Sequence, residues 1–242
     1  MAYLIKNREL QKLESHQLQE CPLCGEWQTL MMRGKTQDIE DKSYGVVGDR
    51  GYSFCNCRNI FFTQWKNIDS RINQEPSPVR KLEVEKEWGL IQKYLSRPKN
   101  VWCTDKVAET YLRENNWSNM TFDWRPVHDK KYDLLWLSHH VQGMHSPKDF
   151  MNMLKESLSK DGIIFCTMPD TSHINWESPL EWDWNVQENH ILWNMYDWIA
   201  FVEELGFKCL YGNVSTDVIT LENNSREDYH WIKESRTIFK LA

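Results

Sequence analysis

The chain has 242 residues, of which 40% are hydrophobic and 26% charged, and its formal net charge is −6. This length suits one α/β domain with a small appendage. The acidic balance argues against a general nucleic-acid binder, which usually needs a basic surface. No apolar stretch is long enough to span a bilayer, and the first residues lack the apolar core of a secretory signal, so we expect a cytoplasmic protein.

The N-terminal part is predicted to begin with a helix over residues 1 to about 19. Its apolar residues are Leu4, Ile5, Leu10, Leu13 and Leu18. Further along, the segment 53–62 suits a β-hairpin. Two prolines in the segment 75–78 disfavour helix and strand alike. We therefore expect an N-terminal region over residues 1–75, with the helix and a zinc-binding segment, and a second domain over 79–242.

Four of the seven cysteines lie in the N-terminal region as two close pairs. Cys21 and Cys24 form a C-x2-C pair, and Cys55 and Cys57 form a C-x-C pair. In a reducing compartment such a cluster is more often a metal site than a disulfide framework. Four thiolates suit a tetrahedral, structural zinc ion and leave no open position for catalysis. The alternatives are free buried cysteines, or a metal site that has decayed.

From residue 79 onwards, helical and strand-like segments alternate, which predicts an α/β fold with a parallel sheet. Expected helices cover residues 79–96, 107–115, 147–158 and 192–205. Expected strands cover residues 100–105, 120–124, 132–137, 163–168, 208–211, 218–221 and 232–241. The stretch 132–168 reads as strand, helix, turn and strand, which is typical of a βαβ unit.

Ligand sites in parallel sheets lie just beyond the carboxyl ends of the strands. In the predicted βαβ unit, these ends carry Ser138-His139-His140 and Pro169-Asp170. We therefore expect a pocket at this edge of the sheet, with His140 and Asp170 at its rim.

Three groups of residues together carry a resemblance to a known family. They are 21–25 with Cys55, Cys57 and 60–62; 132–141 with 146–150, Leu158 and 162–165; and 169–170 with 188–193 and 205–207. In order and spacing they resemble class I S-adenosylmethionine-dependent methyltransferases that carry an N-terminal zinc-binding segment. The resemblance implies a Rossmann-like, shortened class I methyltransferase-type sheet with helices on both faces. It also implies S-adenosylmethionine as cofactor and a small-molecule acceptor, such as a sugar or sugar nucleotide.

The sequence departs from this family at the cofactor loop. The family places a glycine-rich loop after its first strand, because the backbone must approach the cofactor closely. Here the segment 101–104 runs straight into Asp105 without a glycine. If this segment is the family's second strand, Asp105 is the acidic residue that binds the ribose hydroxyls, and the first strand is missing. If it is the first strand, a βα unit has been lost before Asp133.

Methyl transfer mainly requires the methyl group to be held in line with the nucleophile. A general base helps when the acceptor is a hydroxyl, and histidine suits that role near neutral pH. Of His139, His140, His145 and His190, which all fall near the predicted carboxyl edge, we predict that His140 and His190 are catalytic. The alternative for each is a loop histidine with no role.

The predicted cofactor-binding residues are Asp105, Ser138 and His139. Asp170 and Glu188 either bind polar groups of the acceptor or are solvated loop charges. Two functions stay open: a small-molecule methyltransferase, and an inactive methyltransferase-like binding or scaffold module that has lost its cofactor. The missing glycine loop is the feature that separates them.

Overall fold

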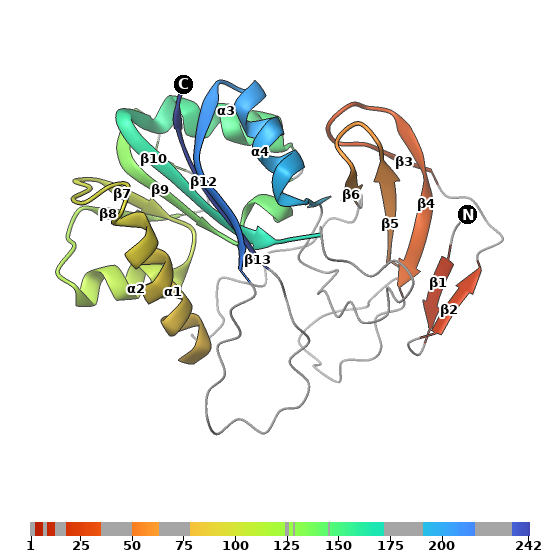
Figure 1. The fold of residues 1–242 in the computed structure, drawn as a ribbon, viewed down its shortest axis with the longest axis horizontal. Coiled ribbons are helices and arrows are strands. Elements are labelled where there is room, and N and C mark those ends of the chain that lie inside the picture. Colours follow the sequence, from red (N-terminus) through yellow and green to blue (C-terminus); the bar gives the residue numbers. More distant parts are fainter. Residues whose placement is uncertain are drawn as a thin grey trace.

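The computed structural model describes residues 3–6, 9–12, 18–34, 50–62, 78–123, 126–127, 129–144, 146–171, 191–215 and 234–242. Within these residues the chain forms two β-sheets, and four α-helices cover the second of them (Figure 1).

The first sheet is built almost entirely from the N-terminal region. Its strands are β1 (Tyr3–Lys6), β2 (Glu9–Lys12), β3 (Leu18–Glu20), β4 (Trp27–Gly34), β5 (Arg50–Cys55), β6 (Ile60–Phe62) and β11 (Ile191–Leu192). Their order is β11-β6-β5-β4-β1-β2, and β3 pairs with β4. The predicted hairpin is confirmed, because β5 and β6 pair antiparallel with Ser53 opposite Phe62.

The helix predicted over residues 1 to about 19 is wrong. β1 and β2 form an antiparallel pair in which Ile5 lies opposite Leu10. β1 also pairs in parallel with β4, where Tyr3 lies opposite Met32. Pairing with a strand from elsewhere in the chain satisfies the backbone groups, so tertiary context overrides the local propensity for helix.

The second sheet confirms the predicted α/β fold. Its elements are α1 (Pro78–Ile91), β7 (Val101–Cys103), α2 (Lys106–Glu114), β8 (Met120–Phe122), β9 (Tyr132–Ser138), the 3-10 turn η2 (Val141–Gly143), α3 (Pro147–Ser157), β10 (Leu158–Pro169), α4 (Met195–Glu204), β12 (Phe207–Ser215) and β13 (Glu234–Leu241). The strand order is β12-β13-β10-β9-β7-β8. β8, β7, β9 and β10 are parallel, whereas β13 runs antiparallel to both β10 and β12. The strand expected over 218–221 lies outside the described residues, and β12 pairs with β13.

Helices cover both faces of this sheet, as predicted. Trp136 of β9 packs in the cluster that contains Val84 of α1 and Leu112 of α2. The next residue, Leu137, packs in the cluster that contains Leu154 of α3, together with residues of α4. Because successive side chains of a strand point to opposite faces, the continuous apolar run of β9 is explained by burial on both sides.

The N-terminal region packs against the α3–α4 face of the second sheet. Cys55 and Phe62 belong to the same buried cluster as the residues of α3 and α4. Asn59 Nδ2 lies 3.3 Å from Asp197 Oδ1 at the start of α4. In addition, β11 adds two residues from the C-terminal part to the first sheet. The division into residues 1–75 and 79–242 stays a prediction.

We expect Gly206→Ala to destabilise the protein by about 1 kcal/mol. Gly206 follows the C-cap of α4 with φ +86°, and an added Cβ would lie 2.5 Å from Lys155 Nζ. Gly89→Ala is the matched control, because a Cβ added at Gly89 would meet nothing within 4 Å. Because Gly89 lies in the interior of α1, Gly89→Ala should stabilise the protein by about 1 kcal/mol. Urea denaturation measures both, and equal effects of the two variants would contradict this interpretation.

Candidate functional site

The carboxyl edge of the second sheet has a topological switch point between β7 and β9. From β7 the chain passes outward to β8, and it then returns to the other side of β7 as β9. Ligands of open α/β sheets bind in the crevice at such a point. Here Asp105 follows β7, and Ser138 is the last residue of β9.

The position of β7 bears on the two alternatives for the segment 101–105. β7 pairs directly with β9, with Val101 opposite Leu134. β8 lies on its outer side. This order favours β7 as the first strand of the predicted family sheet, with the missing unit between β8 and β9. The second strand is then β8, and the acidic residue that follows it is Asp123.

A half-buried ion cluster from α1 fills the edge between Asp105 and Ser138. Arg80 Nε lies 2.7 Å from Asp105 Oδ2. Arg80 Nη1 lies 2.7 Å from Glu87 Oε1 and 3.0 Å from Glu83 Oε2. Arg80 Nη2 donates to Ser138 Oγ at 2.7 Å. The guanidinium therefore joins α1 to the ends of both strands that flank the switch point.

Glu87 is the innermost charge of this cluster, with a side chain that is 0% exposed. Its Oε2 accepts hydrogen bonds from Trp136 Nε1 at 2.8 Å and from Ser138 Oγ at 3.0 Å. Burial alone would lower the pKa of Arg80, but the charges of Glu87 and Asp105 hold this pKa well above its ordinary value. Arg80 and Glu87 thus form a compensated ion pair, which the further hydrogen bonds of Glu87 support.

Two of the predicted cofactor-binding residues, Asp105 and Ser138, are brought together by this cluster. Asp105 also caps α2, because its Oδ1 accepts the backbone N–H of Val107 at 2.7 Å. α2 begins at Lys106, directly after this cap, so the helix leaves no room for a glycine loop. The cofactor roles of both residues stay predictions.

The third predicted cofactor-binding residue, His139, lies at the same edge of the sheet but contacts a residue of β13. Its Nε2 lies 2.8 Å from Glu234 Oε1, at the start of β13. Burial would raise the pKa of Glu234, but the charges of His139, Arg80 and Arg236 lower it to about 2.

The predicted catalytic residue His140 lies on the opposite, α3 side of the edge, where it is 3% exposed. Its ring centroid is 5.3 Å from that of Phe150 and 6.5 Å from that of Trp102. The other predicted catalytic residue, His190, lies outside the described residues, as do His145 and Glu188. The catalytic roles of His140 and His190 stay predictions.

Asp170, expected at the rim of the pocket, is 3% exposed. Its Oδ2 accepts the backbone N–H of Met195 at 2.8 Å, at the start of α4. It also forms an isolated parallel bridge with Trp193, which directly follows β11. Asp170 thus ties the end of β10 to the beginning of α4.

Sequence reasoning missed Arg80, Glu87, Asp123 and Glu234. A signal was present for α1, where Arg80, Glu83 and Glu87 recur at helical spacing (i, i+3, i+7) and therefore share one face. Glu234 had no such signal, because its proximity to His139 depends on the pairing of β13 with β10.

We expect Glu234→Gln to flatten the acid side of the stability profile. The folded pKa of Glu234, about 2, lies below its ordinary value of 4.5. Its ionisation therefore stabilises the fold fully above about pH 4.5, and this contribution is lost as the pH falls towards 2. Its size is about 3 kcal/mol. Urea midpoints between pH 2 and 7 measure it, and parallel profiles of wild type and variant would contradict the assignment.

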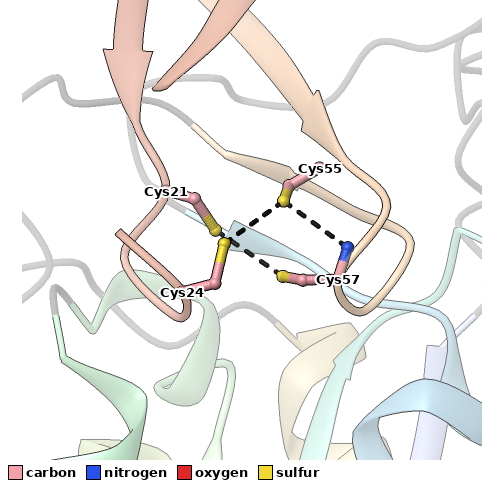
Figure 2. A group of neighbouring side chains, drawn as sticks. All are labelled: Cys21, Cys24, Cys55 and Cys57. Carbon is pink, nitrogen blue, oxygen red and sulfur yellow. Dashed lines mark hydrogen bonds between the residues drawn. The ribbon is translucent and has the colours of Figure 1, made fainter. Parts of the chain in front are cut away.

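The four cysteines of the N-terminal region form one compact group (Figure 2). Their sulfur atoms all lie within 4.8 Å of one another. Cys21 Sγ is 3.8 Å from Cys57 Sγ, and Cys24 Sγ is 3.6 Å from Cys55 Sγ. Zn–S bonds of about 2.3 Å in a tetrahedron place sulfur atoms about 3.8 Å apart. The donor set and its spacing therefore fit a structural zinc ion.

The local backbone shapes this group. Cys21 and Cys24 lie in the turn between β3 and β4, where Gly25 has φ +76° and donates to the Cys21 carbonyl at 2.9 Å. Cys55 ends β5, and its sulfur accepts the N–H of Cys57 at 3.5 Å. Burial raises the pKa of Cys21 to about 11, so metal binding would release protons from these thiols.

Among the described helices, none combines the length and the apolar character needed to cross a membrane. No protein-family model matches the sequence, and no curated protein matches it.

Solved structures of similar fold include S-adenosylmethionine-dependent methyltransferases. A 1,6-didemethyltoxoflavin-N1-methyltransferase from Burkholderia thailandensis, bound to 1,6-didemethyltoxoflavin and S-adenosylhomocysteine, is 7% identical with TM-score 0.48, over 82% of this chain and 98% of that chain. A methyltransferase from Clostridium acetobutylicum is 11% identical with TM-score 0.38, over 59% and 75%. The [4+2]-cyclase SpnF is 10% identical with TM-score 0.47, over 71% and 86%. At these values the likeness concerns the fold, and a fold does not fix a reaction.

Proposed function

We propose that the chain is an S-adenosylmethionine-dependent methyltransferase that acts on a small molecule. The observation that carries the proposal is the switch point between β7 and β9, where charged and polar side chains gather at the carboxyl edge. Crevices at such points are the usual ligand sites of doubly wound sheets.

The charges at this edge of the sheet suit the cofactor's sulfonium group, which is a cation. Among the described residues, four carboxylates, from Glu83, Glu87, Asp105 and Glu234, face the guanidinium groups of Arg80 and Arg236 and the imidazole of His139. The edge is therefore acidic, which favours a cation.

Asp123 is an exposed carboxylate just after β8, the strand next to β7. This is the place where the family resemblance puts the acid that binds the ribose hydroxyls. Asp105 and Ser138 are bound to Arg80, so they would have to exchange this partner for the cofactor. The finer proposal, a sugar or sugar nucleotide as acceptor, rests on the resemblance alone.

When bound, the cofactor supplies an activated methyl group. The chain itself would hold the acceptor in line with that group and shield both from water. His140 and His190 are the histidines proposed for proton transfer, and α1 would cover the crevice from one side through Arg80 and Glu83.

Calorimetric titration with S-adenosylmethionine tests the proposal. We expect a micromolar dissociation constant, and a weakening of about tenfold in Asp123→Asn, which loses a charged hydrogen bond to the ribose. Asp161→Asn is the matched control, because Asp161 is an exposed acid at the opposite, amino-terminal part of β10. Absence of heat up to millimolar concentration would reject the enzyme.

The second candidate is a methyltransferase-like module that has lost its cofactor and serves as a binding or scaffold domain. The specific observation that favours it is the Arg80 cluster, which satisfies Asp105 and Ser138 internally, together with the direct start of α2 after Asp105. A folded protein that is silent in the titration is the result expected for this module.

We also propose that the four-cysteine group binds a structural zinc ion. The sulfur spacing of 3.6–3.8 Å supports it. Purified protein is expected to carry about one equivalent of zinc, measured by atomic absorption. Less than about half an equivalent would count against the site.

A further inference from the structure

The imidazole of His139 and the carboxylate of Glu234 meet across a strand at the carboxyl edge. His139 directly follows β9, Glu234 begins β13, and β10 lies between these strands. His139 Nε2 is 2.8 Å from Glu234 Oε1. The backbone N–H of His139 donates to the carbonyl of Thr167 in β10 at 2.9 Å, which fixes the position of the histidine relative to the strand beneath it.

The backbone of His139 has a conformation that brings its side chain to this face. Trp136 of β9 faces α1, and Leu137 faces α3 and α4. Regular alternation would turn His139 to the same side as Leu137. Its φ of +48° breaks the alternation, and the imidazole meets Glu234, which shares a face of β13 with Ile238 of the α1-side cluster.

A residue other than glycine seldom holds a positive φ, and such strain concentrates at functional sites. Exposure separates the two partners: the His139 side chain is 29% exposed, whereas that of Glu234 is 13% exposed. The imidazole is therefore the more accessible partner, and the carboxylate behind it is the more shielded one.

In the part of the chain that the structure describes, charged groups from β13 and α1 act on the pair. Arg236 Nη2 of β13 lies 3.7 Å from Glu234 Oε2. From α1, Arg80 and Glu83 act on the pair electrostatically. Burial and the charge of Glu234 raise the pKa of Glu83. Of these groups, the Glu234 carboxylate is the one in direct contact with the imidazole, so it is placed to stabilise the positive charge that the imidazole would gain on accepting a proton.

We propose that His139 takes the proton of the acceptor and that Glu234 is its positioning residue. This inference rests on the proposed methyltransferase function and adds a third histidine to the predicted His140 and His190. With Nε2–H donating to Glu234, the lone pair of the neutral imidazole is on Nδ1.

In the step, the O–H bond of a hydroxyl acceptor breaks and its proton moves to His139 Nδ1. The electron pair of the oxygen forms the bond to the methyl group, and the sulfur of the donor keeps the pair of the bond that breaks. The Nε2–H bond to Glu234 stabilises the imidazolium that results.

NMR of protein labelled with 15N-histidine tests the pair without any acceptor. We expect Nε2 to carry the proton in neutral His139 and Nδ1 to titrate. Glu234→Gln should lower the pKa of His139 by about one pH unit or more. Glu85→Gln is the control, because Glu85 is exposed on α1 and should leave this pKa unchanged. A proton on Nδ1, or a pKa that does not move in Glu234→Gln, would overturn the inference.

Methyl transfer to catechol, a small probe with an acidic hydroxyl, tests the catalytic role. His139→Gln should lower the rate of methyl transfer at saturating S-adenosylmethionine by about 100-fold or more, and Glu234→Gln should shift the acidic limb of the pH–rate profile. A His139→Gln variant that transfers methyl groups at the wild-type rate overturns this inference alone. Absence of cofactor binding in the wild type overturns the proposed function as well. If the wild type leaves catechol unmethylated, the inference is judged by the NMR titration, that is, by the tautomer of His139 and by the change of its pKa in Glu234→Gln.

Discussion

Glu87→Ala is expected to lower the free energy of unfolding by about 3 kcal/mol. The substitution removes the innermost partner of Arg80 and leaves the buried Trp136 Nε1–H and Ser138 hydroxyl without their acceptor. Arg80 keeps Asp105 and Glu83, so the loss should fall at the lower end of the range for a broken buried ion pair.

Urea denaturation followed by tryptophan fluorescence measures this loss. Glu85→Ala is the matched control, because it removes an exposed glutamate from the same helix and should change stability by less than about 0.5 kcal/mol. A Glu87→Ala variant as stable as the control would show that the ion cluster is not a structural element of the edge.

Removal of metal from the cysteine group is expected to unfold the hairpin of β5 and β6. Structural zinc sites of this kind supply about 10 kcal/mol or more of binding free energy, which is comparable with the whole stability of a domain. Because β6 holds β11, and Trp193 after β11 bridges Asp170, the effect should reach the end of β10.

Hydrogen exchange before and after treatment with a strong chelator measures this coupling. We expect loss of amide protection in β5, β6 and β11, and the same loss in Cys55→Ala. Cys209→Ala is the control, because Cys209 lies on β12, away from the four-cysteine group. Protection that survives chelation in a protein known to have carried zinc would contradict a structural role.

The parts of the fold that were predictable from sequence have strong local patterns. The βαβ unit 132–168 was predicted because two apolar runs flank an amphipathic helix, and the structure pairs β9 with β10 in parallel. The cysteine group was predictable because ligand spacing depends on a few residues in two turns. By contrast, β1 depends on pairing with β4, and β2 depends on pairing with β1. A pairing with a distant strand leaves no trace in the local sequence pattern.

The candidate site was predictable only in outline. The carboxyl ends of β9 and β10 were placed correctly near Ser138 and Pro169, because they follow from the boundaries of the two apolar runs. The Arg80 cluster depends on how α1 lies over the edge, and the contact between His139 and Glu234 depends on the place of β13 in the sheet. A positive φ at a histidine also leaves no signal in a sequence, unlike one at a glycine.

A crystal structure of the protein with S-adenosylhomocysteine tests the central claim most directly. We expect electron density for the ligand at the crevice between β7 and β9, with its ribose at Asp123 and with Arg80 released from Asp105 or Ser138. An Arg80 cluster that stays intact under saturating ligand, with no ligand at this crevice, would contradict the claim.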